Sequence, residues 1–253
     1  MKFALSIVLV TVCRDSLLRA VRSIFAQTFP GSMQVLVGVD RDPNDRATAL
    51  EAELRAACPP HISMTWINLG YSTAKKYGGV HKCSFGGSLR SALTFLANSE
   101  YVMYLDDDDW LKENHVELIL KVIPGKKWAY SYSIYADGNL SQGLCPDEWE
   151  SVGVGKGAYK AKFGGFVRPS GMAINKLEML DIVHLWSCSP TSRGDGEDRL
   201  VFSHLRGESN ACTEQPTVYY SLDPRDGMHP VRVQYMQSKG ITCTIVDKQG
   251  SVR

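Results

Sequence analysis

The sequence lacks an excess of charge of either sign. Its 253 residues include 28 lysines and arginines against 27 aspartates and glutamates, which leaves a formal net charge of +1. Proteins that bind nucleic acid or anionic membranes through their overall field carry a marked positive excess. The composition therefore gives no electrostatic reason to expect a nucleic-acid partner or an anionic membrane.

Cysteine motifs are also lacking. The seven cysteines are odd in number and irregularly spaced, and none belongs to a CxxC pair. Zinc knuckles and secreted disulfide frameworks both depend on such regular spacing. We therefore predict reduced thiols in a cytoplasmic protein. The cysteines are Cys13, Cys58, Cys83, Cys145, Cys188, Cys212 and Cys243.

No apolar run has the length of a membrane span. Residues 3–12 resemble the apolar core of a signal peptide, but Ser6 and Thr11 interrupt them and no small-residue cleavage site follows. We interpret this segment as the first buried strand. The expected location is the cytoplasm without an integral membrane segment, and peripheral contact at the inner face of the membrane is left open.

Phosphate-binding glycine motifs are missing as well. The pairs Gly78-Gly79 and Gly86-Gly87 match neither GxGxxG nor the P-loop pattern. The favoured interpretation is a flexible loop before a helix, although a loop of this kind could close over a ligand. Internal repeats, low-complexity tracts and linkers are not found, so a single domain over residues 1–253 is expected.

The first half of the chain alternates between strand and helix patterns. Apolar runs predict strands over residues 3–12, 33–39, 62–68 and 101–105. Helical periodicity predicts helices over residues 16–26, 46–57 and 88–97. This spacing predicts an α/β fold with a mostly parallel, Rossmann-like sheet flanked by helices.

The second half is less regular. Its patterns predict a glycine-rich irregular stretch over residues 141–172 and leave the tail beyond His229 unassigned. The other elements expected are a helix over 113–122, a strand over 128–135, a short helix near Lys176, a helix over 197–205 and a strand over 217–222.

The most informative stretch is YVMYLDDDDWL, in which a buried strand ends in four aspartates. Ligands bind at the carboxyl ends of strands in open α/β sheets. Adjacent carboxylates repel one another unless a cation or ordered hydrogen bonds neutralise them. Mg²⁺ or Mn²⁺ with a phosphate ligand is the natural partner, and an acidic surface turn is the alternative. We expect Asp109 to cap the helix that begins near residue 112.

Three further sites carry candidate functional groups. Asp40 ends the second predicted strand, where it would accept hydrogen bonds from a ribose or base, or form a plain turn. Glu197 and Asp198 begin a predicted helix, so they are either a general base or a helix cap. His229 lies in a polar stretch and is either a metal ligand or a structural histidine.

Together these segments resemble a family-2 glycosyltransferase of the GT-A fold. LSIVLVTVCRDSLLRAVRSIFAQTF is similar to the first βα unit of that family, and EYVMYLDDDDW matches the segment with its DxD signature. GEDRLVF resembles its Glu-Asp motif. VLVGVDRDPND keeps Asp40 but has Arg41 in place of a second aspartate, and only Arg90 is kept of an Ala-Arg-Asn segment.

The resemblance implies roles on the donor side. Asp40 would contact the base or ribose, and Arg90 would lie near the base or the diphosphate. Asp106 would face the ribose and the hydration shell of a divalent metal, Mn²⁺ or Mg²⁺, and Asp108 would hold the metal directly. The donor-binding set is completed by Thr11 and Asp107. Residues 1–112 would form the nucleotide-sugar-binding half.

The resemblance also implies roles on the acceptor side, in residues 113–253. Asp198 would deprotonate the acceptor hydroxyl, and Glu197 would bind or orient the acceptor. Residues 170–172 would form part of the acceptor wall. His229 is similar to a C-terminal histidine that some GT-A enzymes place on the metal or the diphosphate.

The function implied is a metal-dependent, inverting transfer of a sugar from a nucleoside-diphosphate sugar to an acceptor hydroxyl. The acceptor could be a glycan, a lipid-linked glycan or a protein. The alternatives are a metal-dependent nucleotidyl- or phosphoryl-transferase that uses the same aspartates, and an inactive binding module. Few basic residues flank the aspartates to clamp phosphates, which counts against the former, and both acidic motifs are present, which counts against the latter.

Overall fold

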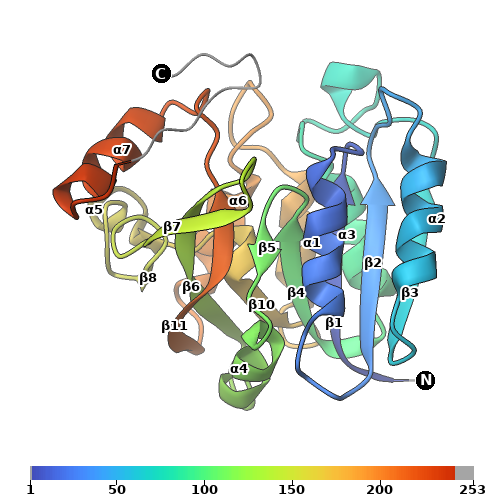
Figure 1. Ribbon diagram of the computed structural model, residues 1–253, viewed down its shortest axis with the longest axis horizontal. Helices are drawn as coiled ribbons and strands as arrows, with labels where there is room; N and C mark the ends of the chain where they lie inside the picture. The colour runs from blue at the N-terminus through green and yellow to red at the C-terminus, as the bar shows by residue number, and fades with distance from the viewer. Residues whose placement is uncertain (1, 243–253) are drawn as a thin grey trace.

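A nine-stranded sheet forms the centre of the protein (Figure 1). The computed structural model describes residues 2–242. The sheet strands are β1 (Phe3–Thr11), β2 (Met33–Val39), β3 (Ile62–Asn68), β4 (Ser99–Asp106), β5 (Trp110–Leu111), β6 (Trp128–Asp137), β7 (Gln142–Pro146), β10 (Met172–Asn175) and β11 (Asn210–Ser221). A separate two-stranded ribbon pairs β8 (Gly153–Val154) with β9 (Gly165–Phe166).

The strand order is β3-β2-β1-β4-β10-β6-β11-β5, and β7 pairs with the carboxyl-terminal part of β6, residues 134–137. The first four strands of this order are parallel, and Ile7 lies between Val35 and Met103 in the register. Strand β10 is antiparallel to both neighbours, β4 and β6, and β11 is parallel to β6. Strands β1, β2, β4, β6 and β11 therefore run in the same direction, and their carboxyl ends share one edge of the sheet.

Helices cover both faces of this sheet (Figure 1). The α-helices are α1 (Ser16–Phe25), α2 (Ala47–Ala57), α3 (Gly87–Leu96), α4 (His115–Val122), α5 (Lys160–Phe163), α6 (Glu197–Leu205) and α7 (His229–Ser238). The 3₁₀ helices are η1 (Lys75–Tyr77), η2 (Pro169–Gly171) and η3 (Leu180–Ser187).

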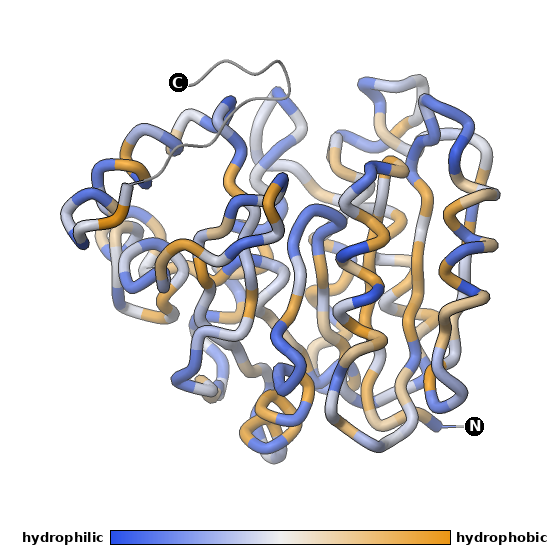
Figure 2. The backbone as a smooth tube through the Cα atoms, viewed as in Figure 1, coloured by the Kyte–Doolittle hydropathy of each residue, from blue (hydrophilic) through white to orange (hydrophobic). Residues whose placement is uncertain are grey.

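Alternation along β1 explains why the sheet needs two covering layers. Leu5, Ile7 and Leu9 pack with α1, α2 and α4, whereas Val8 and Val10 pack with α3, η3 and α6. Successive side chains of a strand point to opposite faces, so an uninterrupted apolar strand is stable only when both faces are buried. Burial of each such aliphatic side chain contributes about 1.5–3 kcal/mol. Figure 2 shows the central strands as largely hydrophobic tubes.

The regular part of the first half matches the sequence-based prediction. Strands β2 and β3 have the predicted bounds, and β1, α1, α2, α3 and β4 differ from them by one or two residues. The α/β fold with a mostly parallel sheet is confirmed. Helix α6 also has the predicted bounds.

Several predictions for the second half were wrong or incomplete. No helix begins near Lys176, because residues 172–175 form β10 and the helical segment starts only at Leu180. The stretch over residues 141–172 contains β7, β8, α5 and β9. Within the tail beyond residue 228, residues His229–Ser238 form α7, and residues 243–253 lie outside the described residues. Short strands of two to five residues are too brief to show a periodicity.

The cysteines of the described residues form no disulfide. Six of the seven cysteines lie within residues 2–242, and all six are free. Cys243 lies outside the described residues. Within the same part of the chain, no helix combines the length and the apolar character needed to cross a bilayer.

Candidate active site

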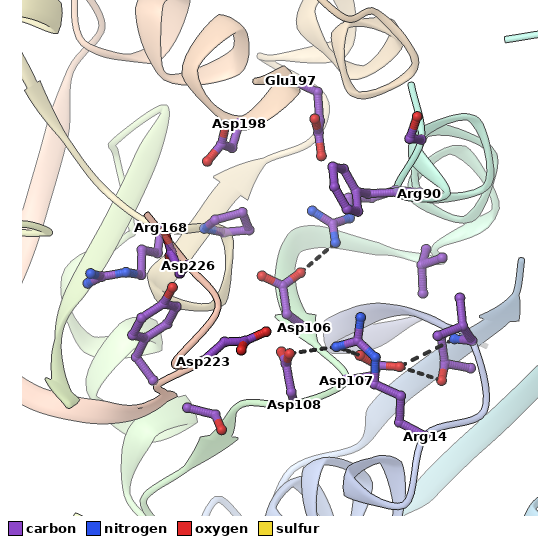
Figure 3. A pocket seen from close by; sticks show the side chains of 18 of the residues that line it. Arg14, Arg90, Asp106, Asp107, Asp108, Arg168, Glu197, Asp198, Asp223 and Asp226 are labelled. Atoms are coloured by element: carbon purple, nitrogen blue, oxygen red, sulfur yellow. Dashed lines mark hydrogen bonds and ion pairs between the residues drawn. The ribbon is translucent and has the colours of Figure 1, made fainter. Parts of the chain in front are cut away.

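An open cleft of about 470 Å³ lies at the carboxyl ends of the parallel strands (Figure 3). It is lined by nine carboxylates and six guanidinium groups, so negative charges are in excess by three. The carboxylates are Asp40, Asp106, Asp107, Asp108, Glu150, Glu197, Asp198, Asp223 and Asp226. The guanidinium groups are those of Arg14, Arg41, Arg90, Arg168, Arg199 and Arg232.

Arg90 links Asp106 to the buried face of the cleft. It projects from α3, is almost fully buried, and its Nη2 lies 2.6 Å from Asp106 Oδ1. Its guanidinium also lies over the Trp186 ring, with Cζ 4.8 Å from the centroid. A buried arginine held in this way fixes the orientation of its carboxylate partner. Asp106, by contrast, keeps about a third of its side chain open to the cleft.

Asp107 is held by β1 and the loop that follows it. Its carboxylate accepts hydrogen bonds from Thr11 Oγ1 at 2.7 Å and from the Val12 backbone N–H at 3.3 Å. Arg14 Nη1 lies 3.1 Å from its other oxygen. Thr11 and Asp107 both line the cleft, and their side chains bind each other, which joins β1 to the end of β4.

Arg14 also reaches the next carboxylate. The same Nη1 lies 2.5 Å from Asp108 Oδ2, so one nitrogen bridges two aspartates. Desolvation and the charge of Asp107 together outweigh the opposing effect of Arg14 and raise the pKa of Asp108 to about 6. A carboxylate with a raised pKa next to other carboxylates is an environment that favours a bound cation. Sequence reasoning missed Arg14, although it lies two residues after the first predicted strand.

Asp109 does not cap a helix, so this prediction was wrong. The helix α4 begins at His115 after Asn114, whereas Asp109 is fully buried. Its carboxylate accepts hydrogen bonds from Ser170 Oγ at 2.6 Å and from the Ser221 N–H at 2.9 Å. Asp109 therefore joins β4 to η2 and β11, and burial raises its pKa.

Residues 170–172 do not form a wall of the cleft. Ser170, Gly171 and Met172 are buried, and Ser170 Oγ accepts a hydrogen bond from the Asp106 N–H at 3.1 Å. Ser170 thereby helps to hold Asp106 and Asp109 in place from the buried side of the cleft. The neighbouring Pro169 lines the cleft instead.

Asp40 holds the loop that follows β3. It is buried at the end of β2, and both of its oxygens accept a hydrogen bond from Ser72 Oγ at 3.1 Å. It also lies between the main cleft and an adjoining hollow of about 420 Å³ lined by Arg41, Tyr71 and Tyr77. The predicted position of Asp40 at a strand end is correct, and its carboxylate bonds to the protein as well as facing the cleft.

Glu197 and Asp198 lie across the cleft from Asp106 and Asp108 (Figure 3). They begin α6, directly after Gly196, whose positive φ of 87° suits a glycine. Burial raises the pKa of Glu197 to about 7, with a further contribution from Asp198, and its Oε2 has no hydrogen-bond partner among the described residues. Burial also raises the pKa of Asp198, which accepts a hydrogen bond from the Arg199 N–H.

His229 does not line the cleft. It is buried at the start of α7, and burial lowers its pKa. The loop before it instead contributes Asp223 and Asp226, and Figure 3 shows Asp223 directed toward Asp106 and Asp108. Sequence reasoning missed both acids, although they follow a predicted strand. Among residues 2–242, no three acidic, histidine or cysteine side chains are arranged as a preformed metal site.

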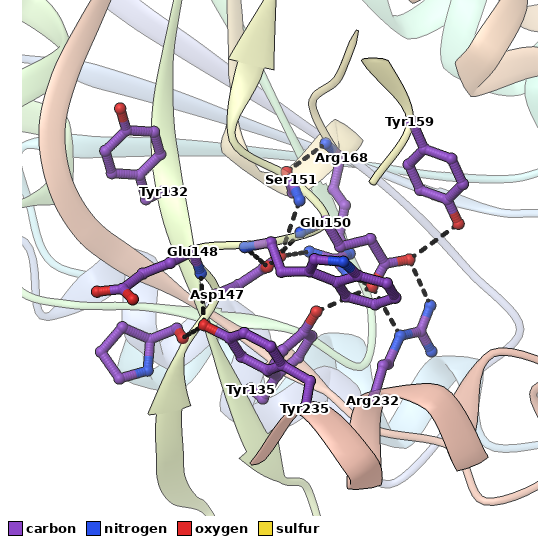
Figure 4. A network of polar contacts seen from close by, with 12 residues as sticks. Tyr132, Tyr135, Asp147, Glu148, Glu150, Ser151, Tyr159, Arg168, Arg232 and Tyr235 are labelled. Atoms are coloured by element: carbon purple, nitrogen blue, oxygen red, sulfur yellow. Dashed lines mark hydrogen bonds and ion pairs between the residues drawn. The ribbon is translucent and has the colours of Figure 1, made fainter. Parts of the chain in front are cut away.

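The other end of the cleft contains a closed network of ion pairs (Figure 4). Glu150 pairs with Arg168 and with Arg232, whose Nε lies 2.7 Å from Glu150 Oε2. Arg168 Nη1 lies 2.5 Å from Asp147, and Arg232 Nη1 lies 2.6 Å from Asp226. The two arginines hold the pKa of Glu150 at about 2 despite burial. Nothing in the sequence pattern pointed to this network.

The structure resembles solved structures that bind nucleotide sugars. The S. aureus TarS fragment 1–349 in complex with UDP-GlcNAc matches with a TM-score of 0.64 and 14% identity, over 90% of this chain and 60% of that one. The mannosyltransferase PcManGT from Pyrobaculum calidifontis, in complex with GDP-Man and Mn²⁺, matches with a TM-score of 0.60 and 10% identity, over 95% of this chain and 64% of that one. The chain has the GT-A fold of glycosyltransferases.

The match to the GT-A fold comes from the comparison of structures, and comparisons of the sequence give no match. No protein-family model matches the sequence, and no curated protein matches it. The chain also spans only about 60% of the TarS fragment and 39% of the longer TarS structure, which it matches with a TM-score of 0.60. The aspartates after β4 and the acids that begin α6 lie at the carboxyl edge of this GT-A sheet.

Proposed function

We propose that the protein is a metal-dependent, inverting glycosyltransferase of family 2 that transfers a sugar from a nucleoside-diphosphate sugar to an acceptor hydroxyl. The observation that carries this proposal is the placement of Asp106 and Asp108 opposite Asp198 across one acidic cleft. The GT-A fold and the nucleotide sugars in the related structures support it.

The cleft fits a divalent cation. Its lining carries a formal excess of three negative charges, and burial together with the charges of Asp107 and Asp106 raises the pKa of Asp108. Asp108 and Asp106 would hold the ion, with Asp223 directed toward the same place. Oxygen ligands of this kind suit Mn²⁺ or Mg²⁺. When bound, the ion would neutralise charge that builds on the departing diphosphate.

The remaining residues would position the donor. Arg90 keeps Asp106 oriented toward the ribose, because its guanidinium is fixed by burial and by the Trp186 ring. Asp40 and the hollow beside it would receive the base and ribose, where Tyr77 offers an aromatic face. The hydrogen bond between Thr11 and Asp107 attaches the loop after β1 to the end of β4, so it would keep these two sides of the donor site at a fixed distance.

Asp198 would act as the general base. It faces the cleft opposite the aspartates, and its raised pKa makes the carboxylate a better proton acceptor than an ordinary aspartate. It would take the acceptor proton while the oxygen attacks the anomeric carbon from the face opposite the leaving diphosphate. This single displacement inverts the anomeric configuration and needs no nucleophile from the protein. Glu197, next to it, would orient the acceptor.

The test is a thermal-shift panel of UDP, GDP, dTDP and CDP, each with and without Mn²⁺, followed by turnover of the selected nucleotide's sugars. A ligand that binds only the folded state raises the melting temperature. We expect one nucleotide to stabilise the protein only with Mn²⁺, and NMR of the product to show the inverted anomer. Release of pyrophosphate in place of the nucleoside diphosphate, or a retained anomer, would overturn the proposal.

A further inference from the structure

The segment between β3 and α3, residues 69–85, exposes an unusual amount of apolar surface. Five of the eleven large hydrophobic side chains that are exposed in the described part of the chain fall within these 17 residues. Val80 is 85% exposed, Tyr71 65% and Phe85 58%. The others in the segment are Leu69 and Tyr77. Exposed apolar side chains grouped in this way mark an interaction surface.

The same segment is purely basic. Lys75, Lys76 and Lys82 are exposed, and no aspartate or glutamate occurs between residues 69 and 85. None of the three lysines forms an ion pair with a carboxylate of residues 2–242. The segment itself therefore carries three positive charges and no negative one within a near-neutral chain, and we call it the basic–aromatic loop (residues 69–85).

The basic–aromatic loop is fixed at its base and exposed at its tip. Asp40 accepts a hydrogen bond from Ser72 Oγ, and the Lys75 N–H donates to the His81 carbonyl at 2.7 Å. On the other side, the Ser84 N–H donates to the Gly194 carbonyl at 2.8 Å. The tip between these anchors includes Val80, and Figure 1 shows the segment projecting beyond the carboxyl ends of β1 and β2.

We propose that the basic–aromatic loop docks the protein on an anionic lipid surface. Apolar and aromatic side chains that insert into the headgroup region, together with lysines that pair with anionic lipids, are the combination that such surfaces bind. An anchored loop loses little conformational entropy when it docks. Tyr77 and Phe85 of the loop also line the cleft, so docking places the mouth of the cleft beside the headgroups.

Two other occupants fit the loop less well. A second copy of the chain would have to bring three lysines against three lysines if the contact were symmetric, and like charges in contact disfavour association. Closure of the loop over a donor would use Tyr77 and Phe85 at its sides but would leave the charged tip without a partner. The purely positive charge of the segment is complementary to anionic lipid.

The experiment is vesicle co-sedimentation with phosphatidylcholine alone and with added phosphatidylglycerol. Each lysine near an anionic surface contributes about 1 kcal/mol, so Lys75→Glu/Lys76→Glu/Lys82→Glu should weaken binding about 100-fold or more. Val80→Asp alone should weaken it less. The matched control replaces the exposed lysines of other surfaces, Lys121→Glu/Lys156→Glu/Lys160→Glu, and should bind as the parent protein does.

Each outcome decides the proposal. Binding that requires phosphatidylglycerol, falls with salt and is lost only in the loop variant supports it. Absence of vesicle binding, equal binding to neutral vesicles, or equal loss in the control variant overturns it, as does a dimer that the loop variant abolishes. Circular dichroism and the melting temperature confirm that each variant is folded. Donor and acceptor are not used, so the result is separate from the test of the proposed function.

Discussion

Two charge clusters line the same cleft and differ in how completely they are paired. At one end, Glu150 contacts two arginines, and its pKa falls to about 2. At the other end, Asp107 and Asp108 share one nitrogen of Arg14, and the pKa of Asp108 rises to about 6. The residue types are the same, so the difference lies in compensation. Removal of one partner from a fully paired buried cluster is costly, whereas underpaired charges are available to a ligand.

The largest expected effect is on turnover. Asp198→Asn removes the proposed base and should lower kcat by about 10²- to 10⁴-fold, the usual contribution of general base catalysis. Donor binding and the free energy of unfolding should stay near those of the parent protein, because Asp198 accepts only a local hydrogen bond from the Arg199 N–H. Asp195→Asn is the matched control, since Asp195 does not line the cleft. Equal loss of donor binding and turnover would remove Asp198 as the base.

Removal of a charge from the paired end of the cleft should lower the free energy of unfolding. Arg168→Ala removes the arginine partner of Asp147 and one of the two arginine partners of Glu150 in a buried place, and it should lower the free energy of unfolding by about 3–5 kcal/mol. Arg55→Ala breaks an exposed pair with Glu51 and should cost no more than about 1 kcal/mol. Urea denaturation measures both. A small effect of Arg168→Ala would show that the network does not support the fold.

The paired Glu150 should differ in its response to pH from Glu197, which lies unpaired among the described residues, across the cleft from Asp106 and Asp108. The pKa of Glu197 is raised in the folded protein, so folding retains its proton, and the stability it contributes falls as pH rises from about 4.5 to 7. The pKa of Glu150 is lowered, so its contribution is present above about 4.5 and is lost as pH falls toward 2. In Glu197→Gln, the free energy of unfolding should decline less between pH 4.5 and 7. The difference from the parent protein in this decline should reach about 1–3 kcal/mol at pH 7. An unchanged pH profile would contradict the assignment.

Removal of a carboxylate from the underpaired end should weaken metal binding without loss of stability. Asp108→Asn should lower Mn²⁺ affinity about tenfold or more, because it removes a charged oxygen ligand. The free energy of unfolding should hold or rise slightly, since repulsion from Asp107 is relieved. Isothermal titration with Mn²⁺ and urea denaturation give the two values. Loss of stability together with unchanged affinity would place the metal elsewhere.

The smallest expected effect concerns Arg14. Arg14→Gln removes the cation that competes with a metal for Asp108, and its ion pair is partly exposed to solvent. We therefore expect Mn²⁺ affinity to increase about two- to fivefold, in line with the energy of exposed pairs. Titration with Mn²⁺ at low donor concentration measures it. A decrease would show that Arg14 supports the metal site rather than competing for it.

The strand ends explain which parts of the site could be predicted. Asp40 and the aspartates after β4 were placed correctly because parallel strands end at one edge of the sheet. The same argument would have included Asp223 and Asp226, which follow β11, had the direction of β11 been known. That direction depends on the antiparallel β10, a four-residue strand without a recognisable period.

The network around Arg168 could not have been predicted. Its members come from positions 147, 150, 168, 226 and 232, and they meet through tertiary packing rather than through any spacing along the chain. The role of Asp109 was missed for the same reason, because its partners Ser170 and Ser221 are 61 and 112 residues away. The local preference of an aspartate is to cap a helix, but the position of Asp109 is determined by hydrogen bonds to residues distant in the sequence.

Strand β10 has a consequence for the order in which the molecule assembles. It lies between β4 and β6, so the two parts of the sheet cannot be joined until residues 172–175 have been synthesised and have paired with both strands. Contacts between such distant segments slow folding, because a long loop must be ordered before they form. A nascent chain that ends at residue 112 would present the bare edge of β4 to its neighbours. We therefore expect the first half alone to aggregate rather than to fold into an independent nucleotide-binding unit.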